Sequence, residues 1–263
     1  MSVRTSNVRS SRGMQMRKAS RQRQIVKAVI ASIVVIATVI AGYTIYTKVI
    51  ASKGSDNVSS SQAENERNAA LKIDKTPVTD KDKDSYKVSN DKPRFMFADS
   101  IGLSRARVKE VGLSSANSDG SQQMEAPTSI YDVGWFNCLN DPVTKTRCSN
   151  YTAPGSSSTK TAAVIDGHSC QGKGCVFDKL GDLEKGDEVR IEMGNGKTYT
   201  YKVVKNETVK LEDLDMNKVM KPATNRPGLN MITCDGSWKA RDSRGVRTMD
   251  HRTVVYTELV SSN

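Results

Sequence analysis

The sequence predicts a mainly β fold, a closed or nearly closed β-barrel with a few short helices, preceded by one N-terminal transmembrane helix. From about Pro93 onward, short β-type runs alternate with Gly, Asn, Asp and Pro. Many short strands within roughly 170 residues favour closure, because a closed barrel has no unpaired sheet edges. An uncharged apolar segment near the start of the chain predicts the membrane helix.

The apolar segment is Ala28–Thr47, twenty residues without a charged side chain. An α-helix rises about 1.5 Å per residue, so this segment can cross the ~30 Å hydrocarbon core of a bilayer. Lys27 and Lys48 flank it and can reach the headgroups. We therefore predict a transmembrane helix over residues 28–48; a buried core helix and a cleaved signal peptide are the alternatives.

The charge distribution predicts the orientation of this helix. Residues 1–27 carry eight basic side chains and no acidic one, in a chain of net charge +11. The positive-inside rule makes residues 1–27 a basic cytoplasmic tail and places the rest outside the cell membrane. Because most of the excess charge lies beside the apolar span, we interpret the high pI as a topology signal. No nucleic-acid partner is expected.

Residues 49–92 are rich in Ser, Asn, Asp, Lys and Glu, and Tyr86 is their one aromatic residue. Such a stretch buries too little apolar area to offset the entropy of ordering, so it predicts a flexible polar stalk. A short helix over Gln62–Leu71 is conceivable within it. The folded extracellular domain is then expected over residues 93–263.

This domain contains seven candidate strands and two candidate helices. The strands are Phe95–Phe97, Ala106–Val111, Thr161–Ile165, Asp187–Met193, Thr198–Val204, Leu229–Thr233 and Arg252–Val260. The run Gly194-Asn195-Gly196-Lys197 predicts a tight hairpin between two of them. The helices are Val176–Leu180 and Leu211–Met220.

Five cysteines in an exported domain suggest at least one disulfide and one thiol left over. Cys234 ends an apolar, strand-like run just before a Gly turn, where a nucleophile can be held rigidly and still be exposed. If Cys234 is reactive, the other four can pair in three ways. We favour Cys138 with Cys148 and Cys170 with Cys175, since short loops close most easily. A zinc site is the alternative, although the spacing matches no compact ligand pattern.

The chain has two histidines, His168 and His251, so Cys/His chemistry has to use one of them. His168 follows an apolar strand and a glycine, where catalytic groups are often displayed; an ordinary loop histidine is the alternative. Arg252 begins a strand eighteen residues after Cys234, and its guanidinium could stabilise an oxyanion or simply pair with a surface carboxylate. His251 precedes Arg252, so their side chains point to opposite faces of the strand, which favours His168 as the partner of the thiol.

These three segments together resemble the sortases, the cysteine transpeptidases of bacterial surfaces. Asn230-Met231-Ile232-Thr233-Cys234 is similar to the signature Thr-Leu-x-Thr-Cys, with Asn and Met in place of the first Thr and the Leu. Val164-Ile165-Asp166-Gly167-His168 resembles the Gly-His motif, and Arg252-Thr253-Val254-Val255 resembles the arginine strand. The likeness extends over about Pro93 to Val260 and looks most like class E or class F sortases. It implies a closed sortase-like barrel of about eight strands.

The resemblance also implies roles for the candidate residues. Cys234 is expected to be the nucleophile, His168 the general acid and base, and Arg252 the group that stabilises the oxyanion and positions the substrate. Thr233 is expected to help shape the substrate site. The implied partners are surface proteins with a Leu-Pro-x-Thr-Gly-like sorting signal, cut after Thr, and a cell-wall peptide or pilin amine as acceptor.

No metal or other cofactor is expected. Calcium activates some sortases, and Glu212, Asp213 and Asp215 form an acidic cluster, which we interpret as a solvated patch. Two other functions stay open from the sequence. One is a hydrolytic cysteine peptidase, and the other is a non-catalytic, disulfide-stabilised surface module in which all five cysteines are structural.

Overall fold

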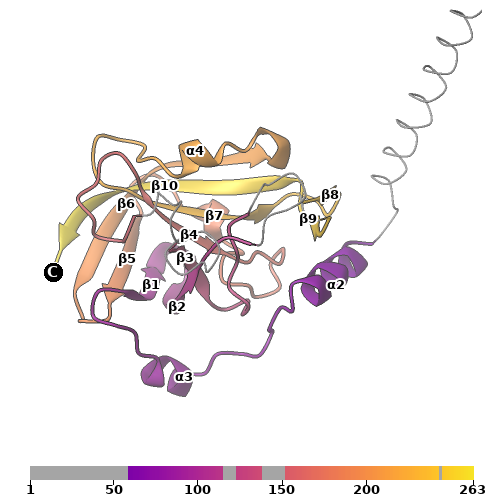
Figure 1. Cartoon of the computed structure of the whole chain (residues 1–263), viewed down its shortest axis with the longest axis horizontal. Helices are drawn as coiled ribbons and strands as arrows, with labels where there is room; N and C mark the ends of the chain where they lie inside the picture. Colours follow the sequence, from indigo (N-terminus) through magenta and orange to yellow (C-terminus); the bar gives the residue numbers. More distant parts are fainter. Residues whose placement is uncertain (1–58, 115–122, 138–151, 243–244) are drawn as a thin grey trace, which may run out of the picture. The chain divides into compact units, whose positions relative to one another are not determined.

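A computed structural model of the chain describes residues 59–114, 123–137, 152–242 and 245–263 (Figure 1). Among these residues, no helix combines the length and the apolar character needed to cross a bilayer. The predicted tail and transmembrane helix lie outside the described residues, as do Cys138 and Cys148.

Eight strands form a closed barrel in the order β1-β2-β3-β4-β7-β10-β6-β5. They are β1 (Pro93–Ala98), β2 (Leu103–Val111), β3 (Val133–Phe136), β4 (Ala163–Gly167), β5 (Glu188–Met193), β6 (Thr198–Lys210), β7 (Leu229–Asp235) and β10 (His251–Ser262). The pairs β2/β3 and β4/β7 are parallel, and the other neighbours are antiparallel. The closed, mainly β barrel predicted from the sequence is confirmed.

The remaining elements are short. They are α2 (Ser60–Ala70), α3 (Asp80–Ser85), η1 (Asp99–Ile101), η3 (Leu180–Asp182), η4 (Leu211–Asp213), α4 (Met216–Val219), β8 (Ala240–Arg241) and β9 (Arg247–Thr248). β8 and β9 pair as a small separate sheet, and α2 lies beside this sheet in Figure 1.

All seven predicted strands are present, with boundaries shifted by a few residues, and the predicted hairpin joins β5 to β6. β3 was missed because it is only four residues long and contains Gly134. The helix predicted at Val176–Leu180 is wrong: turns occupy residues 176–179, and η3 begins at Leu180. The helix predicted at Leu211–Met220 is split into η4 and α4, because Asp215 is extended and caps α4 by accepting a hydrogen bond from the backbone of Asn217.

Two apolar clusters lie on the two sides of the sheet. The first fills the barrel and includes Trp135, Ile165 and Met231. The second lies against the opposite face and includes Val164, Ile232 and residues of α4 and its flanks. Because side chains alternate along a strand, β4 and most of β7 are buried on both faces. The face carrying Val164 and Ile232 also carries the candidate site.

The sequence analysis assigned residues 49–92 to a flexible stalk, but the part of this segment from residue 59 onward packs as one unit with the barrel. Asp74 forms a parallel bridge with Ser129, and Ala63 of α2 is completely buried beside Trp238 and Met249. α2 is further attached by ion pairs to distant residues. The apolar content of residues 59–92 does not reveal this attachment, because ion pairs contribute to it.

Candidate active site

The candidate site lies where β4, β7 and β10 run side by side. In the parallel pair β4/β7, Gly167 is opposite Thr233, so the next residues along the two strands are His168 and Cys234. In the antiparallel pair β7/β10, Arg252 is directly opposite Cys234. The register of three strands therefore brings together the three residues that the sequence singled out as catalytic candidates.

His168 is almost fully buried, with 1% of its surface exposed. Its Nε2 lies 2.6 Å from the carbonyl oxygen of Pro127, which can only accept a hydrogen bond, so we assign the ring proton to Nε2. Nδ1 then accepts a hydrogen bond from Nη2 of Arg67 at 3.2 Å. Burial and the nearby Arg67 charge lower the pKa of His168 to about 4, although the bond to Pro127 acts in the opposite direction. The imidazole is therefore neutral at physiological pH.

Cys234 is the free thiol among the described cysteines and is partly exposed. Its Sγ lies 3.9 Å from Nη2 of Arg67 and 3.8 Å from the hydroxyl of Thr248. Burial raises the pKa of Cys234, but Arg252, Arg67 and the Thr248 hydroxyl outweigh it, so the pKa lies below its ordinary value. A lower pKa enriches the thiolate, which is the nucleophilic form.

Arg252 is held in place by three hydrogen bonds. Nη1 donates to the carbonyl oxygens of Met249 at 2.9 Å and His251 at 2.7 Å, and Nη2 donates to the hydroxyl of Thr248 at 2.9 Å. A guanidinium fixed in this way loses little freedom when it binds a developing negative charge. Thr248, which the sequence analysis did not select, contacts both Arg252 and Cys234.

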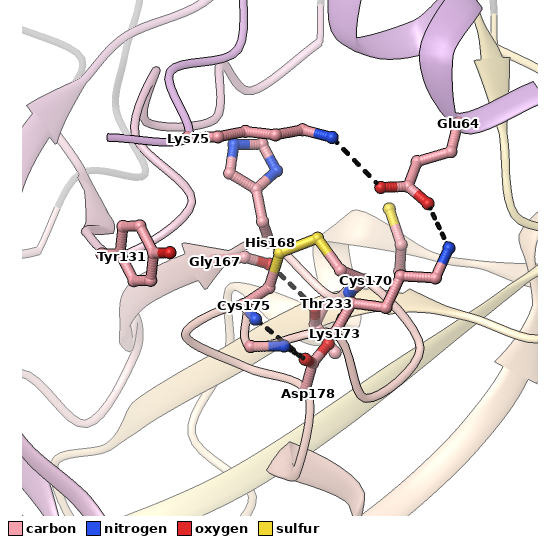
Figure 2. Close-up of a disulfide and its surroundings, with 12 residues drawn as sticks. Glu64, Lys75, Tyr131, Gly167, His168, Cys170, Lys173, Cys175, Asp178 and Thr233 are labelled. Carbon is pink, nitrogen blue, oxygen red and sulfur yellow. Dashed lines mark hydrogen bonds and ion pairs between the residues drawn. A yellow bond between two sulfur atoms is a disulfide. The ribbon is translucent and has the colours of Figure 1, made fainter. Parts of the chain in front are cut away.

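Two residues of the signature-like segment hold neighbouring parts of the fold. The hydroxyl of Thr233 donates to the carbonyl oxygen of Gly167 at 2.8 Å, which ties β7 to β4 next to His168 (Figure 2). Asn230 is fully buried, and its Nδ2 donates to the carbonyl oxygens of Val219 at 2.7 Å and Lys221 at 2.8 Å. Asn230 thereby attaches the segment that follows α4 to the strand that carries the thiol.

The second histidine lies elsewhere. His251 is opposite Asp235 in the strand register, and its Nδ1 lies 2.8 Å from a carboxylate oxygen of Asp250. The alternation along β10 that the sequence analysis used is thus present in the structure. His168, and not His251, is the histidine beside Cys234.

Arg67 is a second site residue that was not predicted from the sequence. It comes from α2, is 6% exposed, and its guanidinium lies 5.6 Å from the centroid of the Trp238 ring. Through one Nη2 it contacts both His168 and Cys234. The available signal was the spacing of Ala63 and Arg67, four residues apart on one helix face, but nothing in the sequence pointed to the partner of that face.

Ion pairs hold α2 over this site. Glu64 pairs with Lys173 at 2.7 Å and with Lys75 at 3.4 Å, as the dashed lines in Figure 2 show. Glu66 pairs with Arg247 of β9 at 2.6 Å. The helix is therefore bonded to the loop that follows β4 and to the β8/β9 sheet.

Lys173 lies in the loop closed by a disulfide between Cys170 and Cys175, the pairing favoured from the sequence. Figure 2 shows this disulfide next to His168. Three residues after the loop, the carboxylate of Asp178 accepts hydrogen bonds from the backbone of Gly174 and Cys175, both at 2.8 Å. The loop that carries Lys173 is thus fixed covalently and by hydrogen bonds.

A pocket of about 670 Å³ opens beside the thiol. It is lined by Cys234, Thr233 and Arg252, and also by the apolar side chains of Leu113, Met124, Leu214, Met216, Met220 and Ile232. Arg67 also lines it. An extended peptide with apolar side chains can therefore lie next to the nucleophile.

The acidic cluster that was considered for calcium lies along η4 and at the start of α4. Among the described residues, no group of three or more His, Cys, Asp or Glu side chains is arranged to hold a metal ion.

Comparison with known proteins identifies the class. The family model described as "Sortase domain" matches residues 129–260, half of the chain, and the chain therefore belongs to the sortase family of cysteine transpeptidases. No curated protein matches.

Solved structures of sortases are similar to this chain at low sequence identity. Sortase C-1 from Actinomyces oris is 18% identical, with a TM-score of 0.42, over 76% of this chain and 98% of that one. Sortase A from Corynebacterium diphtheriae is 17% identical, with a TM-score of 0.42, over 76% and 81%. The Clostridium perfringens sortase D5 transpeptidase is 16% identical, with a TM-score of 0.39, over 77% and 98%. The class E or F likeness stays a prediction.

Proposed function

We propose that this protein is a membrane-anchored sortase that cleaves a Leu-Pro-x-Thr-Gly-like sorting signal and transfers the surface protein to a cell-wall or pilin amine. The observation that carries the proposal is the convergence of His168, Cys234 and Arg252 at neighbouring positions of three adjacent strands. The apolar pocket beside Cys234 supports a peptide substrate.

The proposed reaction begins when Nδ1 of His168 takes the proton of the Cys234 thiol and the resulting thiolate attacks the scissile carbonyl. The C–S bond forms, the carbonyl electrons move to oxygen, and Arg252 stabilises the resulting oxyanion. Collapse breaks the C–N bond, and His168 in its protonated form gives a proton to the leaving amine. A thioacyl enzyme remains. Neutral His168 then takes a proton from an incoming amine, which forms the new amide and releases Cys234.

We further propose that the described arrangement is a closed resting form. Arg67 Nη2 contacts Nδ1 of His168, the nitrogen needed for proton transfer, and also contacts the thiol. While the guanidinium donates to Nδ1, His168 cannot take the proton of the thiol, so a peptide in the pocket does not react. The reaction therefore requires Arg67 to leave this position, and the ion pairs of Glu64 and Glu66 oppose a movement of α2 that would remove it.

We place the catalytic domain outside the cell, tethered by a single helix over residues 28–48 with the N-terminus in the cytoplasm. This part of the proposal rests on the charge pattern of the sequence. Protease treatment of intact cells tests it: the domain is expected to be digested while an epitope placed on residues 1–27 is protected. Protection of the domain contradicts this topology.

Hydrolysis by the same site is the alternative function. A labelled sorting peptide is incubated with the domain, with and without a small primary amine, and the products are identified by mass. Transfer predicts an amide of the added amine, formed by the wild type and not by Cys234→Ala. A carboxylic acid product whose yield the amine does not change indicates a hydrolytic peptidase. If neither the amide nor the carboxylic acid forms, the result favours a non-catalytic module.

A further inference from the structure

Asp166 is a carboxyl group in the candidate site that the proposed mechanism does not use. It lies on β4 two residues before His168 and lines the same pocket as Cys234. Only 9% of its surface is exposed, and its Oδ1 is a buried oxygen without a hydrogen-bond partner. A buried polar atom without a partner costs free energy. Because Asp166 lines the pocket, a ligand that hydrogen-bonds its carboxyl group can recover this cost.

The neighbouring strand leaves room for this carboxyl. Gly134 of β3 is the register partner of Asp166. A Cβ atom at Gly134 would lie 2.3 Å from Oδ1 of Asp166 and 3.0 Å from Cδ of Pro127. The absence of a side chain at residue 134 is therefore what allows a carboxyl at residue 166. These two residues together shape this wall of the pocket.

The strand register places Asp166 close to the reacting atoms. Asp166 is opposite Ile232 in the parallel pair, two residues before Cys234. The two side chains are therefore diagonal neighbours on the same face of adjacent strands, about 8 Å apart. The substrate residue whose carbonyl acylates Cys234 must have its side chain within a few ångströms of Sγ. That side chain can reach Asp166.

Other polar groups on this wall are already engaged. The Thr233 hydroxyl donates to Gly167, and the Thr248 hydroxyl accepts from Arg252. Apolar walls discriminate weakly between a hydroxyl and a methyl group of the same shape. A carboxyl with an unsatisfied oxygen discriminates strongly, because a substrate without a hydroxyl leaves that oxygen unsatisfied.

We propose that Asp166 is a specificity-determining residue that hydrogen-bonds the hydroxyl of a Thr or Ser side chain on the residue that acylates Cys234. The inference rests on the proposed transpeptidase function. Burial, followed by the charge of Cys234, raises the pKa of Asp166 well above its ordinary value. A protonated carboxyl can both accept from and donate to a hydroxyl, which fits this ligand.

The test compares two peptides that are identical except for Thr or Val at the acylating residue, because these side chains have nearly the same shape. The kcat/KM for transfer to an amine is measured for the wild type, Asp166→Leu and Asp166→Asn. The wild type is expected to prefer Thr by about tenfold or more. Asp166→Leu is expected to bring the two values within about twofold, and Asp166→Asn to retain part of the preference.

The outcomes separate this inference from the proposed function. A wild type that transfers neither peptide defeats the proposed function. The role of Asp166 is overturned if the wild type transfers the Thr and Val peptides equally well. It is also overturned if Asp166→Asn lowers kcat/KM for both peptides by the same factor, so that the Thr-to-Val ratio stays at the wild-type value. If Asp166→Leu fails to fold, the Asp166→Asn ratio decides.

Discussion

Nη2 of Arg67 lies 3.2 Å from Nδ1 of His168, although the two residues are 101 positions apart in the chain. Because Nε2 of His168 donates to Pro127, Nδ1 carries the lone pair available for proton transfer. In the described arrangement, that lone pair is bonded to a permanently charged side chain. The proposed general base therefore cannot accept a proton at Nδ1 until the Arg67 guanidinium leaves this position.

The first prediction is that Arg67→Ala accelerates peptide transfer. Hydrogen bonds to charged groups contribute about 1.5–3 kcal/mol, so losing this contact should increase the open population and the rate by about tenfold or more. The rate is measured across pH, because Arg67 also lowers the pKa of Cys234. Arg226→Ala is the matched control, since Arg226 pairs with Glu258 at the surface. An Arg67→Ala enzyme that is slower than the wild type at every pH contradicts the closed resting form.

The second prediction concerns the pKa of His168, which lies at about 4 because of burial and the charge of Arg67. Arg67→Ala should raise this pKa. NMR titration of the imidazole measures it, and His251→Gln assigns the signal because the chain has only two histidines. An unchanged pKa in Arg67→Ala would show that Arg67 does not control the protonation of His168.

The depressed pKa of His168 also predicts acid sensitivity. The unfolded state, with a pKa of 6.5, binds the proton more readily than the folded state, with a pKa of about 4. The stabilising contribution, about 3 kcal/mol, is complete above pH 6.5 and is lost as the pH falls toward 4. Urea unfolding at a series of pH values measures this loss. A smaller loss is expected for Arg67→Ala, and an equal loss in both proteins would argue against coupling of the two residues.

The ion pair between Glu64 of α2 and Lys173 predicts that Lys173→Ala also increases the transfer rate, but by less than Arg67→Ala. The Lys173 side chain is 54% exposed, so its pair with Glu64 contributes at most about 1 kcal/mol and the expected increase is two- to fivefold. Lys202→Ala, which removes the surface pair with Glu188, should leave the rate unchanged. Equal rates for Lys173→Ala and Lys202→Ala would mean that Glu64 does not hold the helix closed.

Arg252→Lys is predicted to lower kcat for transfer by about 100-fold although it keeps the charge. A lysine cannot reproduce the three hydrogen bonds that fix the guanidinium beside the thiol. Thr248→Val should cause a smaller loss, because it removes one of these bonds. Arg190→Lys, at a surface pair with Asp99, serves as the control. Near-normal activity of Arg252→Lys would exclude a directional role for Arg252 at the oxyanion.

The sequence predicted the barrel because its strands alternate apolar and polar residues or form short apolar runs between Gly and Asn turns. β3 escaped prediction because four residues with a central Gly134 give too little pattern. The catalytic candidates were predictable because Cys234, His168 and Arg252 each lie at the end or start of a recognisable strand. Their roles follow from that placement together with the family resemblance.

The contribution of α2 could not be predicted from the sequence. Glu64 and Glu66 read as solvated charges, and their partners Lys173 and Arg247 lie more than a hundred residues away. Ion pairs of this kind leave no periodic pattern. Asp166 was likewise hidden inside the apolar run of β4, because its buried position depends on the missing side chain of Gly134 on another strand.

The central claim is that Cys234 carries the acyl group, and intact-protein mass spectrometry tests it most directly. The domain is mixed with a sorting peptide, quenched in acid, and mapped after proteolysis. We predict a mass increase equal to the peptide up to its Thr, located on Cys234, which disappears on addition of an amine as the amide product forms. A cleaved peptide without any adduct on Cys234, or transfer of the peptide by Cys234→Ala, would contradict the account.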